Sequence, residues 1–137
     1  LIIYMIAIAL GFAALENALF IFNPLVSGDL ANSLLTGKFR FIGATLLHVL
    51  ASGTVGVFLA LAYYKSAAQK LWWGTFGLFI AVILHALFNF FIMDASGSTI
   101  LGVFLFVWMG LMVLMLIFEK VKILEAEHRP QPLPSLR

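Results

Sequence analysis

Residues 100–118 read ILGVFLFVWMGLMVLMLIF, an apolar run in which no side chain can ionise. A transmembrane α-helix needs about 20 predominantly apolar residues to cross the hydrocarbon core of a bilayer. The run is therefore predicted to be a membrane-spanning helix.

Three similar apolar segments precede this run. We expect them to span the membrane at about residues 1–22, 39–64 and 71–93. The first is expected to end at Asn23-Pro24, because proline lacks a backbone N–H and biases its predecessor away from helix. Residues 23–38 are predicted to be a polar connection, part of which could form a short helix on the membrane surface. The predicted fold is all-α, a polytopic transmembrane helical bundle of about four membrane-spanning helices.

The composition also indicates a membrane protein. Hydrophobic residues make up 64% of the chain and charged residues 10%, whereas a soluble domain has about 45–50% and 25%. We expect residues 1–119 to form one transmembrane domain, followed by a basic, proline-containing and disordered tail at residues 120–137. The chain has no cysteine, which excludes disulfides, thiolate metal ligands and a cysteine nucleophile.

The basic residues predict the orientation of the chain. With four spans, the amino end, the turn at residues 65–70 and the tail lie on one side of the membrane. The opposite side has two basic residues, Lys38 and Arg40. The first side has six: Lys65, Lys70, Lys120, Lys122, Arg129 and Arg137. The positive-inside rule makes the first side cytoplasmic, so the amino end and the tail are expected there. Because these cations lie at segment ends rather than on a soluble face, the expected partner is the lipid bilayer and not nucleic acid.

A few polar side chains lie within the predicted spans. They are Glu16, His48 and His85, together with the amides Asn17 and Asn89. An ionisable group at a helix centre costs roughly 2.5–3.5 kcal/mol on insertion scales, so each calls for a partner. At a rise of 1.5 Å per residue, the three ionisable groups lie roughly 9, 13 and 12 Å below the outer ends of their spans. They are therefore predicted to meet in a polar seam between the first three helices.

The residue types in this seam allow two interpretations. Two imidazoles and a carboxylate, from His48, His85 and Glu16, could bind a divalent metal such as zinc. The spacing is not a zinc signature, since no His-Glu-x-x-His occurs, and the same groups could instead form only hydrogen bonds between helices, with no metal. Asn89, four residues after His85, is expected to orient it, whereas the role of Asn17 is left open.

Three short motifs together resemble one family. They are Gly11-Phe12-Ala13-Ala14-Leu15-Glu16-Asn17, then Arg40 followed by His48, then His85-Ala86-Leu87-Phe88-Asn89. In order and spacing they resemble the PrsW family of intramembrane proteases, which is itself similar to the CAAX-prenyl-protease and bacteriocin-processing superfamily. The resemblance covers roughly residues 11–90.

This resemblance implies a polytopic protease in a bacterial plasma membrane. Its substrate would be a membrane-anchored protein, such as an anti-sigma factor, cut near the outer face of the membrane. Glu16, His48, His85 and Asn89 map onto the motif positions and would be the catalytic residues. The family pattern also begins with two adjacent glutamates, thought to activate the attacking water, and this sequence has no such pair. Because the sequence begins abruptly in an apolar run, we expect it to be the C-terminal part of a longer protein, partnered by missing N-terminal helices or by another membrane subunit.

The leading hypothesis from the sequence is thus a PrsW-type protease. In it, His48 and His85 bind a metal or polarise the substrate carbonyl, Glu16 is a ligand or base, and Asn89 orients His85 or stabilises the oxyanion. The main alternative is a non-enzymatic membrane scaffold or subunit whose polar seam only fixes helix packing. A small transporter is a third alternative, although it would require polar residues through the full depth of the membrane.

Overall fold

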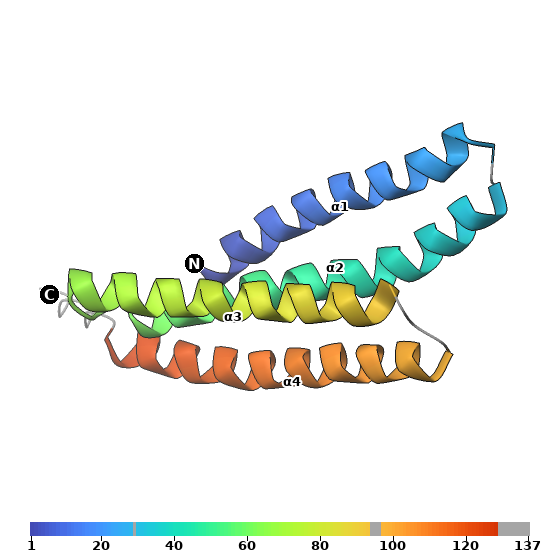
Figure 1. Ribbon diagram of the computed structural model, residues 1–137. Helices are drawn as coiled ribbons and strands as arrows, with labels where there is room; N and C mark the ends of the chain where they lie inside the picture. Colours follow the sequence, from blue (N-terminus) through green and yellow to red (C-terminus); the bar gives the residue numbers. More distant parts are fainter. Residues whose placement is uncertain (29, 94–96, 129–137) are drawn as a thin grey trace, which may run out of the picture.

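The protein is a bundle of four long helices (Figure 1). The computed structural model describes residues 1–28, 30–93 and 97–128. The helices are α1 (Ile2–Val26), α2 (Leu30–Leu61), α3 (Ala67–Met93) and α4 (Gly97–Glu127), and the chain reverses direction after each of the first three. Each is long and apolar enough to cross a membrane. The predicted all-α transmembrane bundle is therefore confirmed.

The end of α1 differs from the prediction. The helix continues through Pro24 to Val26 instead of ending at Asn23-Pro24. Proline removes one backbone donor, and in the last turn of a helix that loss affects a single hydrogen bond. Gly28, two residues after Val26, closes the helix, and its positive φ of 81° is the left-handed conformation that closes many helices. Its N–H donates to the carbonyl oxygen of Leu25 at 3.1 Å.

The predicted polar connection at residues 23–38 is also wrong for most of its length. Helix α2 begins at Leu30, so this segment contributes the last turn of α1, a short turn and the first turns of α2. It does not form a separate surface helix, because the residues from Leu30 onward continue without a break into the apolar span that begins at Phe41. Helix α3 starts at Ala67, before the predicted residue 71. Ser66 and Gln69 cap this earlier start: Gln69 N–H donates to Ser66 Oγ at 3.4 Å and Ser66 N–H donates to Gln69 Oε1 at 3.2 Å.

The carboxyl-terminal helix is longer than expected. Helix α4 continues past Phe118 to Glu127, so the expectation of disorder is wrong for residues 120–127. An ion pair between residues one turn apart, Lys122 Nζ and Glu119 Oε1 at 2.9 Å, supports the extension. The remainder of the predicted tail, residues 129–137, lies outside the described residues.

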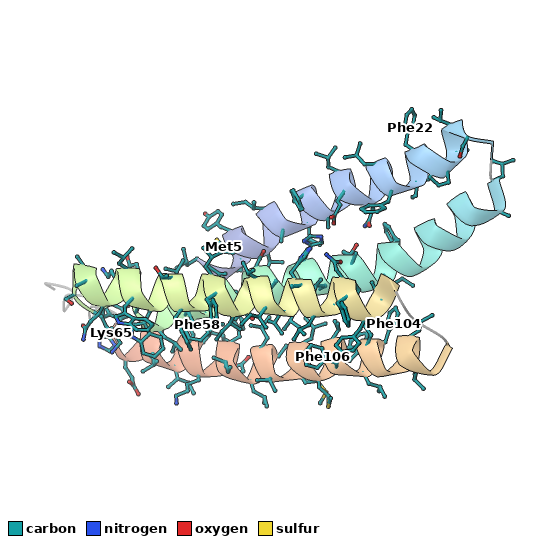
Figure 2. The ribbon with its side chains drawn as sticks, in the orientation of Figure 1. Met5, Phe22, Phe58, Lys65, Phe104 and Phe106 are labelled. Atoms are coloured by element: carbon teal, nitrogen blue, oxygen red, sulfur yellow. The ribbon has the colours of Figure 1, made fainter. Side chains whose placement is uncertain are left out.

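Helix α2 is the centre of the bundle. Half of its span is buried (50%), against 17% of each of the other three spans. Among the described residues, α1 packs against α2 alone, whereas α3 and α4 contact α2 and each other. The shared core of α2, α3 and α4 consists of Ala44, Leu47, Phe88, Val103 and Val107. Large apolar side chains such as that of Phe22 lie on the outside (Figure 2), as expected for helices solvated by lipid.

Glycine allows α3 to approach α2 closely. A Cβ atom added at Gly77 would lie 2.8 Å from the Cβ of Phe58. Because that atom is fixed to the backbone of α2, it cannot move away by a rotamer change. Small residues at such positions let the backbones of membrane helices pack together, and this packing sets the distance between the polar residues that α2 and α3 carry.

Candidate functional site

The candidate site begins with a hydrogen bond between α1 and α2. His48 Nε2 lies 2.8 Å from Glu16 Oε2, and the exposed fractions of the two side chains are 8% and 25%. When Glu16 is ionised, the carboxylate only accepts, so His48 Nε2–H is the donor. The predicted need of each intramembrane ionisable group for a partner is thus met by a carboxylate and an imidazole from different helices.

The imidazole of His48 also contacts α3. The ring centroids of His48 and His85 lie 5.1 Å apart, and the ring planes are inclined at 59°. This confirms the prediction that the two imidazoles approach closely enough to share a ligand or a water molecule. On the α1 side, Phe12 presents the edge of its ring to His48 at 5.4 Å. His48 therefore lies at the centre of the polar seam, between residues of α1 and α3.

A second polar contact joins α1 to α2 next to this pair. Asn17 Nδ2 donates to Thr45 Oγ1 at 3.2 Å. Asn17 is buried, with 4% of its surface exposed. In the part of the chain that the structure describes, its other polar atom, Oδ1, is buried without a hydrogen-bond partner. Buried polar atoms of this kind are uncommon in native proteins, so this one requires an explanation.

Asn89 lies on α3, one turn after His85, and is half-buried. The contacts described above connect Glu16, His48 and His85, and they do not include Asn89. Its expected roles, orienting His85 or stabilising an oxyanion, therefore remain predictions. Arg40, which contributes to the motif resemblance, belongs to α2, and its side chain is outside the described part of the structure.

The donor chemistry of the site suits a divalent metal. Zinc binds imidazole nitrogen and carboxylate oxygen, the groups that His48, His85 and Glu16 carry. Two imidazoles bound to one tetrahedral zinc, with Zn–N bonds of about 2.0–2.1 Å, place their ring centroids about 5 Å apart, close to the observed 5.1 Å. Among the described residues, however, no three His, Cys, Asp or Glu side chains form a group that could hold a metal ion. The site matches zinc in residue type and ring spacing but is not a closed three-ligand set.

The spacing of residues along the sequence could have indicated Phe12 and Thr45 as neighbours of the site. Phe12 precedes Glu16 by four residues and Thr45 precedes His48 by three, and both spacings place side chains on one face of a helix. Asn17 was ambiguous because it is adjacent to Glu16 and therefore displaced around α1. Only the direction from which α2 packs on α1 shows that both consecutive side chains reach it.

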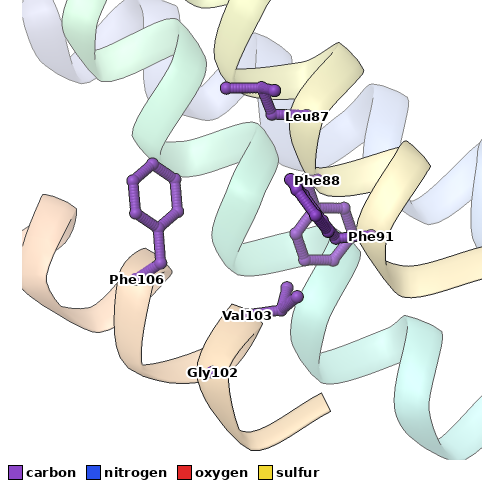
Figure 3. Close-up of a pocket in the computed structure, with 6 residues that line it drawn as sticks. All are labelled: Leu87, Phe88, Phe91, Gly102, Val103 and Phe106. Atoms are coloured by element: carbon purple, nitrogen blue, oxygen red, sulfur yellow. The ribbon is translucent and has the colours of Figure 1, made fainter. Parts of the chain in front are cut away.

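A separate cavity lies between α3 and α4. Its first lining residue on α3, Leu87, follows His85 by two positions. The cavity measures about 330 Å³ and is lined by Leu87, Phe88, Phe91, Gly102, Val103 and Phe106 (Figure 3). None of these side chains carries a polar group. The cavity can hold an apolar group, and its described lining residues include none able to transfer a proton or bind a metal.

Comparison with known proteins agrees with the motif resemblance. Residues 2–117 match the family described as PrsW family intramembrane metalloprotease. The match covers α1 to α3 and α4 as far as residue 117, and it includes Glu16, His48, His85 and Asn89. No curated protein and no solved structure matches the chain significantly.

Proposed function

Because this chain belongs to the PrsW family of intramembrane metalloproteases, we propose that it hydrolyses a peptide bond in a membrane-anchored protein substrate. The observation that carries the proposal is the hydrogen bond of 2.8 Å between Glu16 and His48, with the ring of His85 beside it. A carboxylate and two imidazoles from three helices are costly inside a membrane. Such clusters are characteristic of functional sites rather than of helix packing alone.

In the proposed reaction, the oxygen of a water molecule attacks the scissile carbonyl carbon. The Glu16–His48 pair accepts, on the Glu16 carboxylate, the proton that the water loses, while the imidazole of His48 stays hydrogen-bonded to that carboxylate. The C–N bond then breaks, and the same pair returns the proton to the leaving amine. His85 lies next to the pair and binds or polarises the carbonyl oxygen. Asn89 orients His85 or stabilises the negative charge that develops on that oxygen.

The family description implies a metal ion. In our proposal His48 and His85 would hold it, with Glu16 as either a further ligand or the base, and zinc is the ion whose ligand preferences these donors match. A bound divalent ion supplies Lewis acidity and lowers the pKa of a bound water. The chain's own contribution is to hold the imidazole of His48 between Glu16 and His85.

The alternative function is a membrane scaffold or subunit. It is favoured by the finding that the described residues contain no three-residue metal group and by the small size of interhelical hydrogen-bond energies, on average about 0.6 kcal/mol. In that case the Glu16–His48 bond only fixes α1 against α2. For either function we propose an integral plasma-membrane protein whose amino end and tail are cytoplasmic.

The Glu16→Gln variant tests the protease proposal. Glutamine keeps an oxygen that accepts a hydrogen bond from His48 but cannot take up a proton, so we expect membrane insertion to persist and cleavage to fall by about 10²–10⁴-fold. The measurement is cleavage of a membrane-anchored reporter panel by the full-length protein in bilayers. Glu119→Gln, at an exposed position on α4, is the matched control and should cleave normally. Unchanged cleavage by Glu16→Gln would refute the assignment.

A further inference from the structure

The face of α1 that packs on α2 is made almost entirely of small or apolar residues. Its buried positions are Ile2, Ala9, Ala13 and Asn17. They recur at intervals of seven or four residues and so form one stripe along the helix. Among the α1 side chains that the structure describes, Asn17 is the only polar member of this stripe. An alanine there would continue the pattern set by Ala9 and Ala13 and would leave no unpaired oxygen.

Apolar solvation by itself does not fix how α1 is rotated about its axis. Among the described residues, α1 packs against α2 alone, and its exposed faces are also apolar, as at Ile8, Leu15 and Leu19. In lipid, turning one apolar face toward α2 in place of another changes the solvation energy little, because lipid tails are as apolar as the side chains. Close packing, as of Ile2 against Gly56, favours one face of α1, and polar contacts add directional selection of the rotation.

Two polar contacts do so together. Consecutive residues of a helix point about 100° apart, yet Glu16 reaches His48 and Asn17 reaches Thr45. Thr45 and His48 lie one turn apart on α2. Either hydrogen bond alone would leave α1 free to turn about it, whereas both together define one rotation and one axial register.

We infer that Asn17 is a positioning residue, whose hydrogen bond to Thr45 holds α1 in the rotation at which Glu16 meets His48. The positioning role stands on the contacts alone. Its effect on cleavage rests on the proposed function, in which the Glu16–His48 pair carries the proton of the reaction. The positioning role explains why a buried amide with an unpaired oxygen occupies a stripe of small residues: the donor half of the amide is used, and the oxygen is left over.

The decisive measurement is ¹⁵N NMR of the imidazoles in the full chain reconstituted in bilayers. With three histidines, the signals can be assigned by single substitutions. The His48 Nε2 signal of Glu16→Ala defines the state without the carboxylate partner. We expect Asn17→Ala and Thr45→Val to move the His48 signal at least half of the way toward that state. Thr45→Ser keeps the hydroxyl and should leave the signal as in the unmodified protein.

Thermal unfolding separates positioning from ordinary packing. Asn17→Ala is expected to unfold at the same temperature as the unmodified protein or a higher one, because it removes the unpaired buried oxygen. Ala9→Gly, in the same stripe, should lower the unfolding temperature while leaving the His48 signal in place. In cleavage assays, Asn17→Ala and Thr45→Val should lower kcat about tenfold and change KM less than threefold.

An unchanged His48 signal in Asn17→Ala would overturn the inference. So would a His48 signal that weakens only in proportion to the amount of folded protein lost. Failure of the proposed function gives a different pattern. In that case the His48 signal responds to Asn17→Ala as expected, but Glu16→Gln still cleaves the reporter fully or the unmodified protein cleaves none of the panel.

Discussion

The carboxylate of Glu16 on α1 and the imidazole of His48 on α2 meet at 2.8 Å, next to the hydrogen bond between Asn17 and Thr45 across the same helix interface. His48 is central to the site because the same ring lies 5.1 Å from that of His85 on α3. Any displacement of α1 or α3 relative to α2 therefore changes the surroundings of one imidazole. The predictions below test the chemistry of this group, its metal, the packing that holds it and its orientation in the membrane.

Replacement of His85 distinguishes chemistry from helix packing. We expect His85→Ala and His85→Gln to insert and fold almost normally, because one interhelical hydrogen bond contributes only about 0.6–1.7 kcal/mol. Both should lose cleavage of a membrane-anchored reporter, since an amide cannot exchange protons near neutral pH and is a poor zinc ligand. Full cleavage by His85→Gln would show that this position needs only a hydrogen-bonding group.

Metal content provides a test that does not depend on activity. If Glu16, His48 and His85 hold a divalent ion, His48→Ala and His85→Ala should each lower bound zinc by at least about tenfold, the usual effect of disturbing a metal site. His128→Ala is the matched control, because His128 stacks on Tyr64 with ring centroids 4.2 Å apart, away from the site. Elemental analysis of the purified proteins gives the result. Equal zinc content in all three variants would contradict the proposed ligands.

The close contact of α3 with α2 predicts a destabilised variant. Gly77→Ala would place a Cβ atom 2.8 Å from Phe58 Cβ, so the two helices would have to separate, at a cost of about 1–3 kcal/mol. Gly102→Ala is the control, since its added Cβ has no atom within 4 Å, and it should be neutral or slightly stabilising because alanine favours helix. Unfolding in detergent measures both, and equal stability of the two variants would refute this view of the interface.

The orientation can be tested with single cysteines because the chain has none of its own. On the charge asymmetry, a cysteine at Ser66, in the turn between α2 and α3, should react with a membrane-impermeant thiol reagent only after the cells are permeabilised. A cysteine at Ser98 should react in intact cells. The opposite labelling pattern would reverse the predicted topology.

The sequence by itself determined the all-α membrane fold and the identity of the polar residues. Apolar runs such as residues 100–118 can only be satisfied as helices in lipid, because every backbone polar group must find its partner within the segment. Counting residues from the span ends also predicted that His48 and His85 lie at similar depths, since helical rise is constant. Depth depends on position along one helix, and such information is local.

The helix ends were less predictable, because competing local signals lie close together. Pro24 indicated an end, but Gly28 in its left-handed conformation closes α1 two residues after Val26. The same applies to α2, where apolar residues from Leu30 onward outweighed the polar ones between them. These boundaries depend on which of several nearby residues stops the helix.

Only the tertiary structure decided which side chains face one another. The rotation of α1 about its axis cannot be read from a segment that is apolar on every side, and it is this rotation that brings Glu16 to His48 and Asn17 to Thr45. The close packing of Gly77 against Phe58 likewise depends on residues from two helices. Contacts between helices depend on the relative rotation and distance of two segments, which no single segment of sequence specifies.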